Sequence, residues 1–346
     1  MFNKKTVLIT GGTGSLGKKL VQIIANEYKP EKLIIFSRDE LKQFEMSQKW
    51  SINKYPFIRY FLGDVRDKDR LFRAFDKVDY VIHAAALKQV PAAEYNPCEF
   101  IKTNVMGAMN VIDAAIYNRV KKVIALSTDK ACNPINLYGA TKLCSDKLFV
   151  AANVYSGFNN TRFSVVRYGN VLGSRGSVVP FFKERAITGV LPITDKDMTR
   201  FWITLDQAAH FVINTLKYVK GGEIFVPKIS SMRIVDLAKA IAPECKQQIV
   251  GIRPGEKIHE TLISQEEARN TIEFKECFIV YPNTHKAEVH ETMKAKGWFC
   301  SDNFEYSSDT NTKWLKVADL KKMVEQISED YAIEKSRWSM EDIPEQ

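Results

Sequence analysis

The stretch TVLITGGTGSLGKKL at residues 6–20 decides the fold, because it joins an apolar run to an amphipathic run through a glycine-rich turn. The turn fits G-x-G-x-x-G and G-x-x-G-x-x-G, with glycines at Gly11, Gly12, Gly14 and Gly17. Residues without a Cβ let the backbone turn sharply and approach a pyrophosphate, whose charge the start of the next helix stabilises. In this strand-turn-helix setting the pattern predicts a dinucleotide site, with a purely structural turn as the alternative.

From residue 6 to about residue 175, short β-rich apolar runs alternate with longer amphipathic runs of helical period. The strand candidates are residues 6–10, 32–37, 58–64, 79–85, 121–127 and 162–171, and the helix candidates include 15–28 and 97–118. Such repetition predicts an α/β fold of the Rossmann type, a doubly wound parallel sheet with right-handed crossovers.

The alternation loosens beyond residue 175, where we predict helices at 198–219 and 234–242 and short strands at 222–228 and 247–253. We expect a dinucleotide-binding domain at residues 1–175, to which some later segments return, a smaller substrate-binding lobe at 176–328, and a charged C-terminal tail at 329–346. Because no low-complexity linker separates the two lobes, we expect them to share a cleft.

The composition excludes several classes of protein. The chain has 346 residues and is 45% hydrophobic, which suffices for one large core or two modest ones. Its longest apolar run, residues 81–87, is far short of the ~20 residues that span a bilayer, and no signal peptide precedes the first strand. We therefore predict a soluble, cytoplasmic protein without a membrane partner.

Charge and cysteine content narrow the partners further. The net charge is +9, but the lysines and arginines are scattered and form no nucleic-acid-binding module, so we predict no nucleic acid partner. A surface suited to anionic ligands and a merely solvated basic surface both stay open. The six cysteines lie far apart without a C-x-x-C pair, which predicts reduced, mostly buried thiols and no metal site.

The end of the second predicted strand bears on the cofactor. NAD-binding proteins usually place an acid there for the ribose 2′-hydroxyl, whereas this chain has Ser37 and Arg38. A hydroxyl and a guanidinium suit a 2′-phosphate, so NADP is favoured, although Asp39 keeps NAD open. Asp64 and Val65, after the third strand, suit the adenine, and the alternative for Asp64 is a helix N-cap.

The run VIALSTDKACNPINLYGATK, residues 123–142, carries the candidate chemistry. Tyr138 and Lys142 are four residues apart, so a helix puts both on one face, where a neighbouring ammonium lowers the pKa of a tyrosine. Asp129 and Lys130 closely follow a predicted strand, at the sheet edge where α/β proteins place their chemistry. The alternative for this second pair is an exposed ion pair of little energetic value.

On these residues the chain resembles the extended short-chain dehydrogenase/reductases, and among them the inverting UDP-N-acetylglucosamine 4,6-dehydratases that open pseudaminic acid biosynthesis. The motifs that carry the resemblance are TGGTGSLG, SRDELKQ, GDVRD, HAAALK, AEYNP, STDKACNPINLYGATK, RYGNVLGSRGSVVPFF, MTRFWI, GGEIFVPK and IRPGEK. Retaining sugar dehydratases have Asp-Glu where this chain has Asp129 and Lys130, and capsule-type dehydratases have methionine at the position of Tyr138. The resemblance therefore implies an inverting lyase of the pseudaminic branch.

The resemblance also implies a redox-neutral mechanism in which bound NADP is recycled. In it Tyr138 takes the proton of the sugar 4-hydroxyl, Thr128 hydrogen-bonds to the same oxygen, and Lys142 holds the nicotinamide ribose. Lys130, a neutral base whose pKa desolvation lowers, removes the C5 proton while protonated Asp129 donates to the leaving 6-hydroxyl.

Further binding residues are implied by the same resemblance. Those for NADP are Gly11, Thr13, Gly14, Ser15, Leu16, Gly17, Ser37, Arg38, Asp39, Glu40, Leu41, Lys42, Asp64, Val65, Ala84, Lys88, Tyr138, Lys142 and Val171. Those for UDP-N-acetylglucosamine are Lys88, Asn170, Arg175, Val178, Thr199, Arg253 for the pyrophosphate and Glu256 for the ribose. Family members form dimers or hexamers, so a homo-oligomer is expected.

Two other functions stay open. A UDP-sugar C4 or C5 epimerase on the same fold would share the 4-keto intermediate. A non-catalytic NADP-sensing module would need the cofactor site without the proton-transfer groups. His83, at the end of the fourth predicted strand, is expected to pack rather than to catalyse.

Overall fold

The computed structural model describes residues 1–157, 160–173, 177–282 and 297–336, with side chains described to residue 326. Its centre is a parallel sheet made of β1 (Thr6–Thr10), β2 (Lys32–Ser37), β3 (Ile58–Leu62), β4 (Tyr80–His83), β5 (Lys122–Thr128), β6 (Arg162–Tyr168) and β10 (Ile224–Pro227). Beyond β10 the sheet continues through β15 (Cys277–Val280), β14 (Thr271–Glu273) and β16 (Trp298–Phe299), which pair antiparallel.

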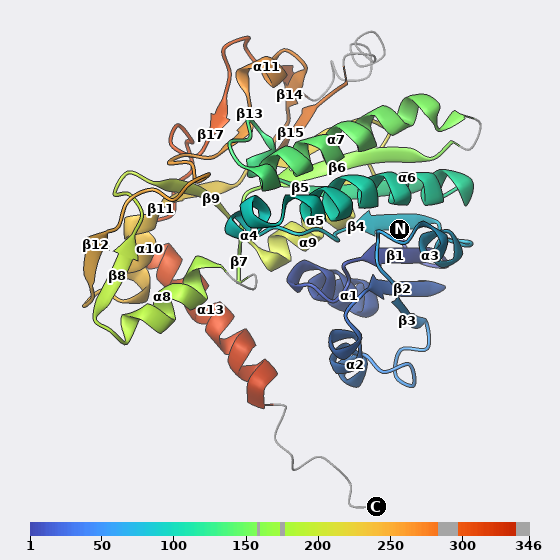
Figure 1. The fold of residues 1–346 in the computed structure, drawn as a ribbon, viewed down its shortest axis with the longest axis horizontal. Coiled ribbons are helices and arrows are strands. Elements are labelled where there is room, and N and C mark those ends of the chain that lie inside the picture. Colours follow the sequence, from blue (N-terminus) through green and yellow to red (C-terminus); the bar gives the residue numbers. More distant parts are fainter. Residues whose placement is uncertain (158–159, 174–176, 283–296, 337–346) are drawn as a thin grey trace, which may run out of the picture.

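The strand order places a crevice next to the glycine-rich turn. Among the described residues the order is β16-β14-β15-β10-β6-β5-β4-β1-β2-β3, so it reverses between β1 and β4 (Figure 1). Ligands of doubly wound sheets bind outside the carboxyl ends of the strands at this reversal. The predicted α/β fold of the Rossmann type is therefore confirmed.

Helices cover both faces of the sheet. They are α1 (Ser15–Glu27), α2 (Glu40–Lys49), α3 (Lys68–Ala74), α4 (Val90–Tyr95), α5 (Pro97–Phe100), η1 (Ile101–Met106), α6 (Gly107–Tyr117), η2 (Asp129–Ala131), α7 (Leu137–Tyr155) and α9 (Leu205–Thr215). In Figure 1, α6 and α7 lie side by side on one face, while α1 packs with α9 on the other. Burial from both sides explains why β1 is apolar and buried along its whole length.

The segment predicted as one helix at 97–118 is three pieces, because a π-helical turn, η1, separates α5 from α6. Such wide turns occur frequently at functional sites. In η1 the side chain of Asn104 is buried, and its amide bonds both the N–H and the carbonyl of Leu87 and the hydroxyl of Thr141. The turn thus ties the loop after β4 to α7.

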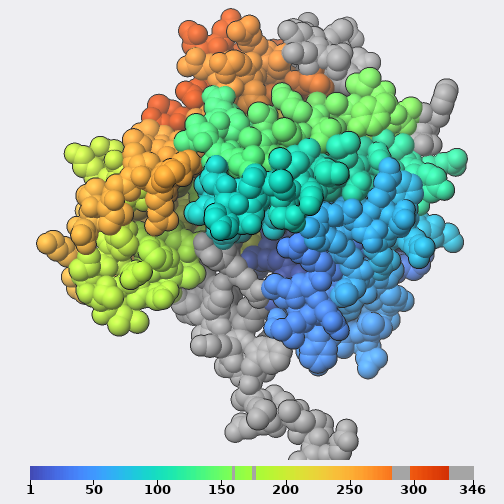
Figure 2. Space-filling view, viewed as in Figure 1, coloured from blue at the N-terminus to red at the C-terminus, as the bar shows by residue number. Residues whose placement is uncertain are grey.

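A smaller lobe has its own elements and core. One of its sheets consists of β7 (Asn170–Leu172), β9 (Thr199–Thr204) and β11 (Ser230–Arg233). Two strand pairs join it, β8 (Val190–Ile193) with β12 (Lys246–Ile249) and β13 (Thr261–Ile263) with β17 (Tyr306–Ser307). Its helices are α8 (Val178–Ala186), α10 (Ile234–Ile241), α11 (Gln265–Ala268) and α13 (Val317–Ser336). Phe182, Leu237 and Leu320 form part of a separate apolar cluster, whereas Leu262 of β13 and Tyr306 of β17 belong to the cluster of the large sheet. Figure 2 shows part of this lobe, in yellow-green and orange, as a mass beside the blue N-terminal part.

Two predicted elements are wrong in detail. Residues 199–204 form strand β9 rather than the start of a helix, and α9 begins at Leu205 because Thr204 and Gln207 form a reciprocal capping box. The predicted strand at 162–171 is broken between β6 and β7, at Gly169. A Cβ on Gly169 would collide with Phe201, so the close approach of β9 requires glycine there.

Three further expectations concern the domain boundaries, the burial of the cysteines and membrane-spanning helices. The domain boundaries at 175 and 328 stay predictions, and α13 continues past residue 329 to Ser336. The free cysteines are less buried than expected, since Cys98 and Cys144 are exposed. Within the described part of the chain, none of the helices combines the length and the apolar character that crossing a bilayer requires.

Candidate active site

A cavity of about 1080 Å³ lies at the carboxyl ends of the central strands and extends to the smaller lobe. It brings together most of the residues predicted for cofactor and catalysis, namely Gly11, Thr13, Gly14, Ser15, Leu16, Gly17, Ser37, Arg38, Asp39, Lys42, Asp64, Val65, Ala84, Lys88, Thr128, Asp129, Lys130, Tyr138, Lys142 and Val171. The predicted substrate residues that line it are Lys88, Asn170, Val178, Arg253 and Glu256. Their roles stay predictions.

Three of the predicted residues that the structure describes are not part of this lining. Glu40 and Leu41 lie on α2 outside it, and Leu41 is exposed. Thr199 is buried behind the wall, where its hydroxyl is 2.7 Å from Ser308 Oγ and 2.9 Å from His259 Nδ1. Arg175 lies outside the described residues.

The glycine-rich turn has the geometry that a pyrophosphate requires. Gly11 has a φ of +66°, and a Cβ there would lie 2.8 Å from the backbone nitrogen of Ala85. Gly14 is the N-cap of α1 and has no side chain to cap it, so the positive end of the helix dipole faces the cavity. These residues therefore fit a dinucleotide whose phosphates lie at the start of α1.

The end of β2 carries more positive than negative charge toward the cavity. Asp39 is the N-cap of α2, accepts a hydrogen bond from the Lys42 backbone at 3.0 Å, and also pairs with the Lys42 ammonium. Its charge is thereby balanced by Lys42 and the helix dipole. Arg38 is half-exposed, and its Nη1 is 3.6 Å from Asp64 Oδ2.

Asp64 is not the helix N-cap that was considered as an alternative. The N-cap of α3 is Asp67, which accepts from the Arg70 backbone. Asp64 instead accepts from the backbone of Arg66 at 3.0 Å and from its guanidinium at 2.8 Å. Because it lines the cavity, its position agrees with the predicted contact to the adenine end.

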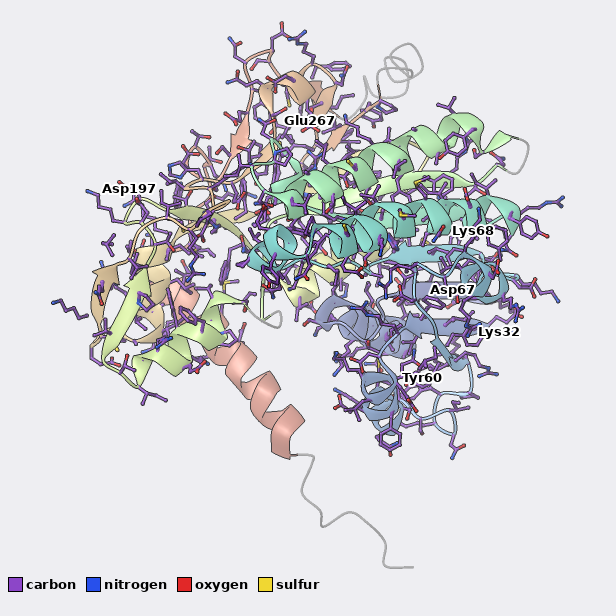
Figure 3. All side chains as sticks on the ribbon, viewed as in Figure 1. Lys32, Tyr60, Asp67, Lys68, Asp197 and Glu267 are labelled. Carbon is purple, nitrogen blue, oxygen red and sulfur yellow. The ribbon has the colours of Figure 1, made fainter. Side chains whose placement is uncertain are left out.

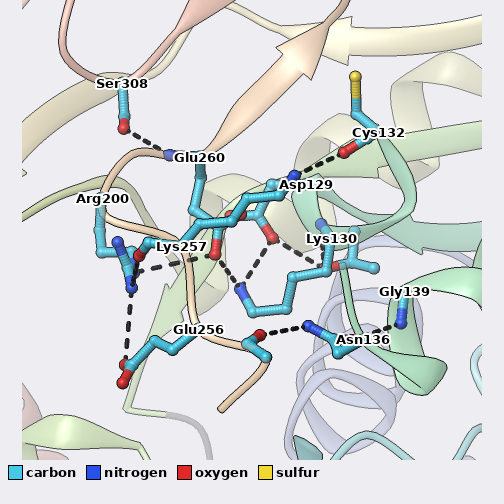
Figure 4. Close-up of polar contacts among 12 residues, drawn as sticks. Asp129, Lys130, Cys132, Asn136, Gly139, Arg200, Glu256, Lys257, Glu260 and Ser308 are labelled. Atoms are coloured by element: carbon cyan, nitrogen blue, oxygen red, sulfur yellow. Dashed lines mark hydrogen bonds and ion pairs between the residues drawn. The ribbon is translucent and has the colours of Figure 1, made fainter. Parts of the chain in front are cut away.

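The acid and base candidates lie together at the end of β5 (Figure 4). Thr128 Oγ1 donates to Asp129 Oδ1 at 2.9 Å, and Lys130 Nζ donates to the same oxygen at 3.1 Å. The Asp129 side chain is 1% exposed, and its second oxygen has no hydrogen-bond partner among the described residues. An exposed surface ion pair is therefore excluded for Asp129 and Lys130.

Lys130 meets a second carboxylate that the sequence did not reveal. Its Nζ is 2.9 Å from Oε1 of Glu260, a side chain that is 2% exposed. Burial alone lowers the pKa of Lys130, but the charges of Asp129 and Glu260 outweigh burial and raise it. The lowering of the Lys130 pKa that was expected from desolvation under a bound sugar stays a prediction, because the protein groups alone raise this pKa.

Tyr138 lies on α7, whose N-cap Asn136 accepts from the Gly139 backbone at 2.8 Å. Burial raises the pKa of Tyr138 to about 12, while Lys130 and a hydrogen bond with Thr128 act in the opposite direction. Lys142 is also buried and donates to the Leu126 carbonyl at 2.7 Å. The cation that lowers the pKa of Tyr138 here is thus Lys130, not Lys142 as expected.

A loop at residues 253–260 connects the smaller lobe to this acid-base group (Figure 4). Lys257 Nζ donates to the Cys132 carbonyl at 2.7 Å, and Asn136 Nδ2 donates to the Gly255 carbonyl at 2.7 Å. Arg200 on β9 donates to the Lys257 carbonyl at 2.8 Å. Sequence reasoning missed Arg200, Lys257 and Glu260, because only the fold brings them to η2.

A buried ionic network links the ends of β5 and β6 to α7 and α11. Arg167 on β6 donates to Glu267 at 2.8 Å and lies 3.5 Å from Asp146 on α7. Asp146 accepts from Ser127 at 2.7 Å. Glu267, labelled in Figure 3, lies at α11 of the smaller lobe, so the network joins both lobes below the cavity.

The fold and the site define an extended short-chain dehydrogenase/reductase. A family model described as "Polysaccharide biosynthesis protein" matches residues 7–282, and the chain belongs to this family. The chain is 56% identical over 331 residues to the UDP-N-acetylglucosamine 4,6-dehydratase (inverting) of Campylobacter jejuni, covering 94% of this chain and 98% of that protein.

Two further comparisons broaden the range of relatives. The chain is 43% identical over 277 residues to the UDP-glucose 4-epimerase of Rickettsia canadensis, covering 77% of this chain and 80% of that protein. It is similar to the X-ray structure of Pen from Bacillus thuringiensis, with a TM-score of 0.86, 36% identity, and coverage of 94% of this chain and 99% of that one.

Proposed function

We propose that this chain is an NADP-dependent hydro-lyase that converts UDP-N-acetylglucosamine to UDP-2-acetamido-2,6-dideoxy-β-L-arabino-hex-4-ulose by inverting 4,6-dehydration. The observation that carries the proposal is the contact of Asp129 with Lys130 beside Tyr138, in the cavity that the glycine-rich turn also lines. The 56% identity to a relative of that name over nearly the whole chain supports the same activity. By the resemblance, the product enters pseudaminic acid biosynthesis.

The first half of the reaction oxidises the sugar at C4. Tyr138 removes the proton of the 4-hydroxyl, and Thr128 and the charge of Lys130 stabilise the phenolate that must form. Lys142 would hold the ribose of the nicotinamide, which when bound would supply a hydride acceptor for C4 and a hydride donor for C6. The 4-ketone then acidifies the neighbouring C5 proton.

The second half requires an acid and a base on the same edge of the sugar. Transfer of one proton from Lys130 to Asp129, over the 3.1 Å hydrogen bond, turns the ion pair into a neutral amine and a carboxylic acid. The amine then takes the C5 proton, and Asp129 protonates the 6-hydroxyl, which leaves as water. Reprotonation of C5 on the opposite face by a proton from solvent inverts that centre.

The choice of NADP over NAD is supported by the end of β2. Ser37, Arg38 and Lys42 line the cavity and suit a 2′-phosphate. Asp39, the residue that kept NAD open, uses its carboxylate to cap α2 and to pair with Lys42. We therefore propose that Arg38 and Lys42 bind the 2′-phosphate.

The nucleotide end of the substrate is assigned to the smaller lobe. Arg253 and Glu256 line the cavity, and we propose that they bind the pyrophosphate and the ribose of UDP. Lys88 adds a further cation to the lining, and burial lowers its pKa. We also propose a cytoplasmic location and a homo-oligomeric state for this protein.

The proposal is tested by incubating the purified protein with UDP-N-acetylglucosamine in D₂O without added reductant, followed by mass and NMR analysis. We expect a product that has lost one water and carries deuterium at C5, with no net change in cofactor redox state. Unchanged substrate with the cofactor bound would instead favour the non-catalytic module.

The second candidate is a C4 epimerase, which the 43% identity to a UDP-glucose 4-epimerase favours. An epimerase would return a sugar that retains its 6-hydroxyl and incorporates no deuterium at C5. The same NMR spectrum therefore separates the two activities.

A further inference from the structure

Glu260 is a buried acid that the mechanism above does not use. Its side chain is 2% exposed, and Oε1 lies 2.9 Å from Lys130 Nζ. The same oxygen is 3.9 Å from Arg200 Nε, and the second oxygen, Oε2, has no partner among the described protein groups. Burying a carboxylate is costly unless it is paired, so its position beside a reacting amine needs a reason.

We propose that Glu260 is the positioning residue for proton transfer by Lys130, holding its Nζ in place and balancing the ammonium that forms when Lys130 takes the C5 proton. The inference rests on the dehydration proposed above. It follows the general arrangement in which a base is oriented by a third group that stabilises its protonated form.

The protons of the elimination step balance without an outside reagent. Lys130 first gives one proton to Asp129, and its amine then forms a new N–H bond as the C5–H bond breaks, leaving the electron pair on the sugar. Asp129 loses its proton to the departing oxygen, so the pair ends as ammonium and carboxylate, as it began. Glu260 stays ionised throughout and gains an ammonium partner as the C5 proton moves.

Other charged groups around Lys130 do not provide this function. Asp129 is used as the acid and cannot also be a constant counter-charge. Arg200 and Lys88 are cations, which oppose the ammonium, and Tyr138 is neutral once it has taken the 4-hydroxyl proton in the first half-reaction. Glu260 is therefore the fixed negative charge that contacts Nζ.

The position of Glu260 also connects substrate binding to the chemistry. It follows Glu256, the proposed ribose ligand, in the loop that Lys257 and Asn136 anchor to the catalytic segment. Arg200 bonds this loop through the carbonyls of Lys257 and Ile258. We therefore expect that nucleotide binding to this loop affects the position of the Lys130 amine through Glu260.

The experiment uses the full chain with its bound cofactor and the variant Glu260→Gln, which keeps the shape and removes the charge. In single turnovers, we expect C4 oxidation to stay within about threefold of wild type, because the Thr128 hydroxyl and the Lys130 charge that act on Tyr138 are both kept in the variant. Loss of water should fall by about 100-fold, at the lower end of what a positioned proton-transfer group contributes. Reduced nicotinamide should therefore accumulate.

The pH profile gives a readout that a structural role would not change. Asp129 and Lys130 share one proton in the active form, so the rate of dehydration is bell-shaped in pH. Removing the charge of Glu260 lowers the pKa of Lys130, so the limb of the profile that reflects Lys130 should move to lower pH in Glu260→Gln. Glu260→Asp should recover part of the wild-type rate and profile.

A matched control is Glu273→Gln, which removes a glutamate paired with Lys228 at 2.6 Å outside the cavity lining and should behave as wild type. If wild type dehydrates and Glu260→Gln matches its rate and profile, the inference on Glu260 is overturned while the function stands. If both half-reactions fall equally with a lower melting temperature, Glu260 is only structural. If wild type loses no water, the proposed function itself fails.

Discussion

At the scale of single residues, the site depends on Lys130 lying between Asp129 and Glu260. One ammonium with two buried carboxylates leaves a negative charge that the cation Arg200, 3.9 Å from Glu260, offsets. A single proton can then move between neighbouring groups without leaving the cavity. This arrangement suits an elimination that needs an acid and a base at the same moment.

Tyr138→Phe tests the assigned role in C4 oxidation. Losing the hydroxyl should slow formation of reduced nicotinamide by about 100- to 10,000-fold, the usual contribution of a positioned acid or base. Cofactor content should not change, because the ring still fills its place between Ala93 and Phe100. Stopped-flow absorbance of reduced nicotinamide measures the rate, and an unaltered rate would remove Tyr138 from the mechanism.

Arg38→Ala tests the choice of cofactor. Removing the guanidinium should weaken NADP binding by about 10- to 100-fold, the value of a charge-assisted hydrogen bond, and leave NAD binding nearly unchanged. Calorimetric titration of cofactor-stripped protein measures both affinities. Arg73→Ala, at an exposed arginine on α3 outside the cavity lining, is the control. Equal weakening of both cofactors would contradict the assignment.

The sequence predicted those site residues that follow a strand or share a helix face. One cavity is lined by three such groups: Gly11, Gly14 and Gly17 after β1, Asp129 and Lys130 at the end of β5, and Tyr138 with Lys142 on α7. Glu260 and Arg200 could not be predicted, because they reach Lys130 from the smaller lobe through tertiary contacts. For the same reason the sequence did not predict that Glu260 helps to raise the pKa of Lys130.

At the scale of elements, the acid-base turn η2 is held in place by close packing against α7. Gly139 makes this possible, because a Cβ at that position would overlap the carbonyl oxygen of Lys130. The glycine therefore lies between the two halves of the Y-x-x-x-K motif for a packing reason. Because Gly139 has no side chain, α7 can pack closely against η2, and this packing sets the distance between Lys130 and Tyr138.

Gly139→Ala should displace the Lys130 backbone. We expect a net loss of about 1–2 kcal/mol in unfolding free energy, the cost of overpacking less the gain in helix propensity. Dehydration should fall by about 10- to 100-fold, as expected when reacting groups are misplaced by an ångström. Chemical denaturation and turnover measure the two effects.

The control for this helix is Ala151→Gly, an exposed position on α7 far from η2. It should lower stability by roughly 1 kcal/mol through helix propensity alone and leave turnover unchanged. If Gly139→Ala kept full activity, the packing between η2 and α7 would not be what positions Lys130.

Elements with strong local signals were predicted well, and those set by contacts were not. The strands of the doubly wound sheet follow apolar runs bounded by turns, and the sequence identified them. The sequence of residues 199–204 is compatible with either a helix or a strand. These residues form strand β9 because they pair with β11. The break at Gly169 depends on Phe201, which no local pattern discloses.

At the scale of the whole molecule, a buried histidine links stability to pH. His83 is 2% exposed at the end of β4, 2.8 Å from the Thr10 hydroxyl, and burial lowers its pKa to about 3. The unfolded chain binds a proton near pH 6.5, so the folded state loses stability as the pH falls from that value toward 3. Its packing agrees with the expected structural role.

His83→Gln should remove this pH dependence while keeping a hydrogen bond to Thr10. Between pH 7 and pH 5, wild type should lose about 2 kcal/mol of unfolding free energy more than the variant does. Urea titrations at the two pH values measure the difference. Parallel losses in both proteins would show that His83 is already protonated or solvated in the fold.

The central claim concerns the whole reaction, in which one cavity separates oxidation at C4 from elimination across C5 and C6. The most direct measurement is a single turnover of Lys130→Met with UDP-N-acetylglucosamine in D₂O, following reduced nicotinamide and product together. The account predicts that reduced nicotinamide forms more slowly than in wild type, because the charge that stabilises the Tyr138 phenolate is lost, and then persists, with no loss of water and no deuterium at C5. Release of the dehydrated, deuterated sugar at the wild-type rate would contradict it.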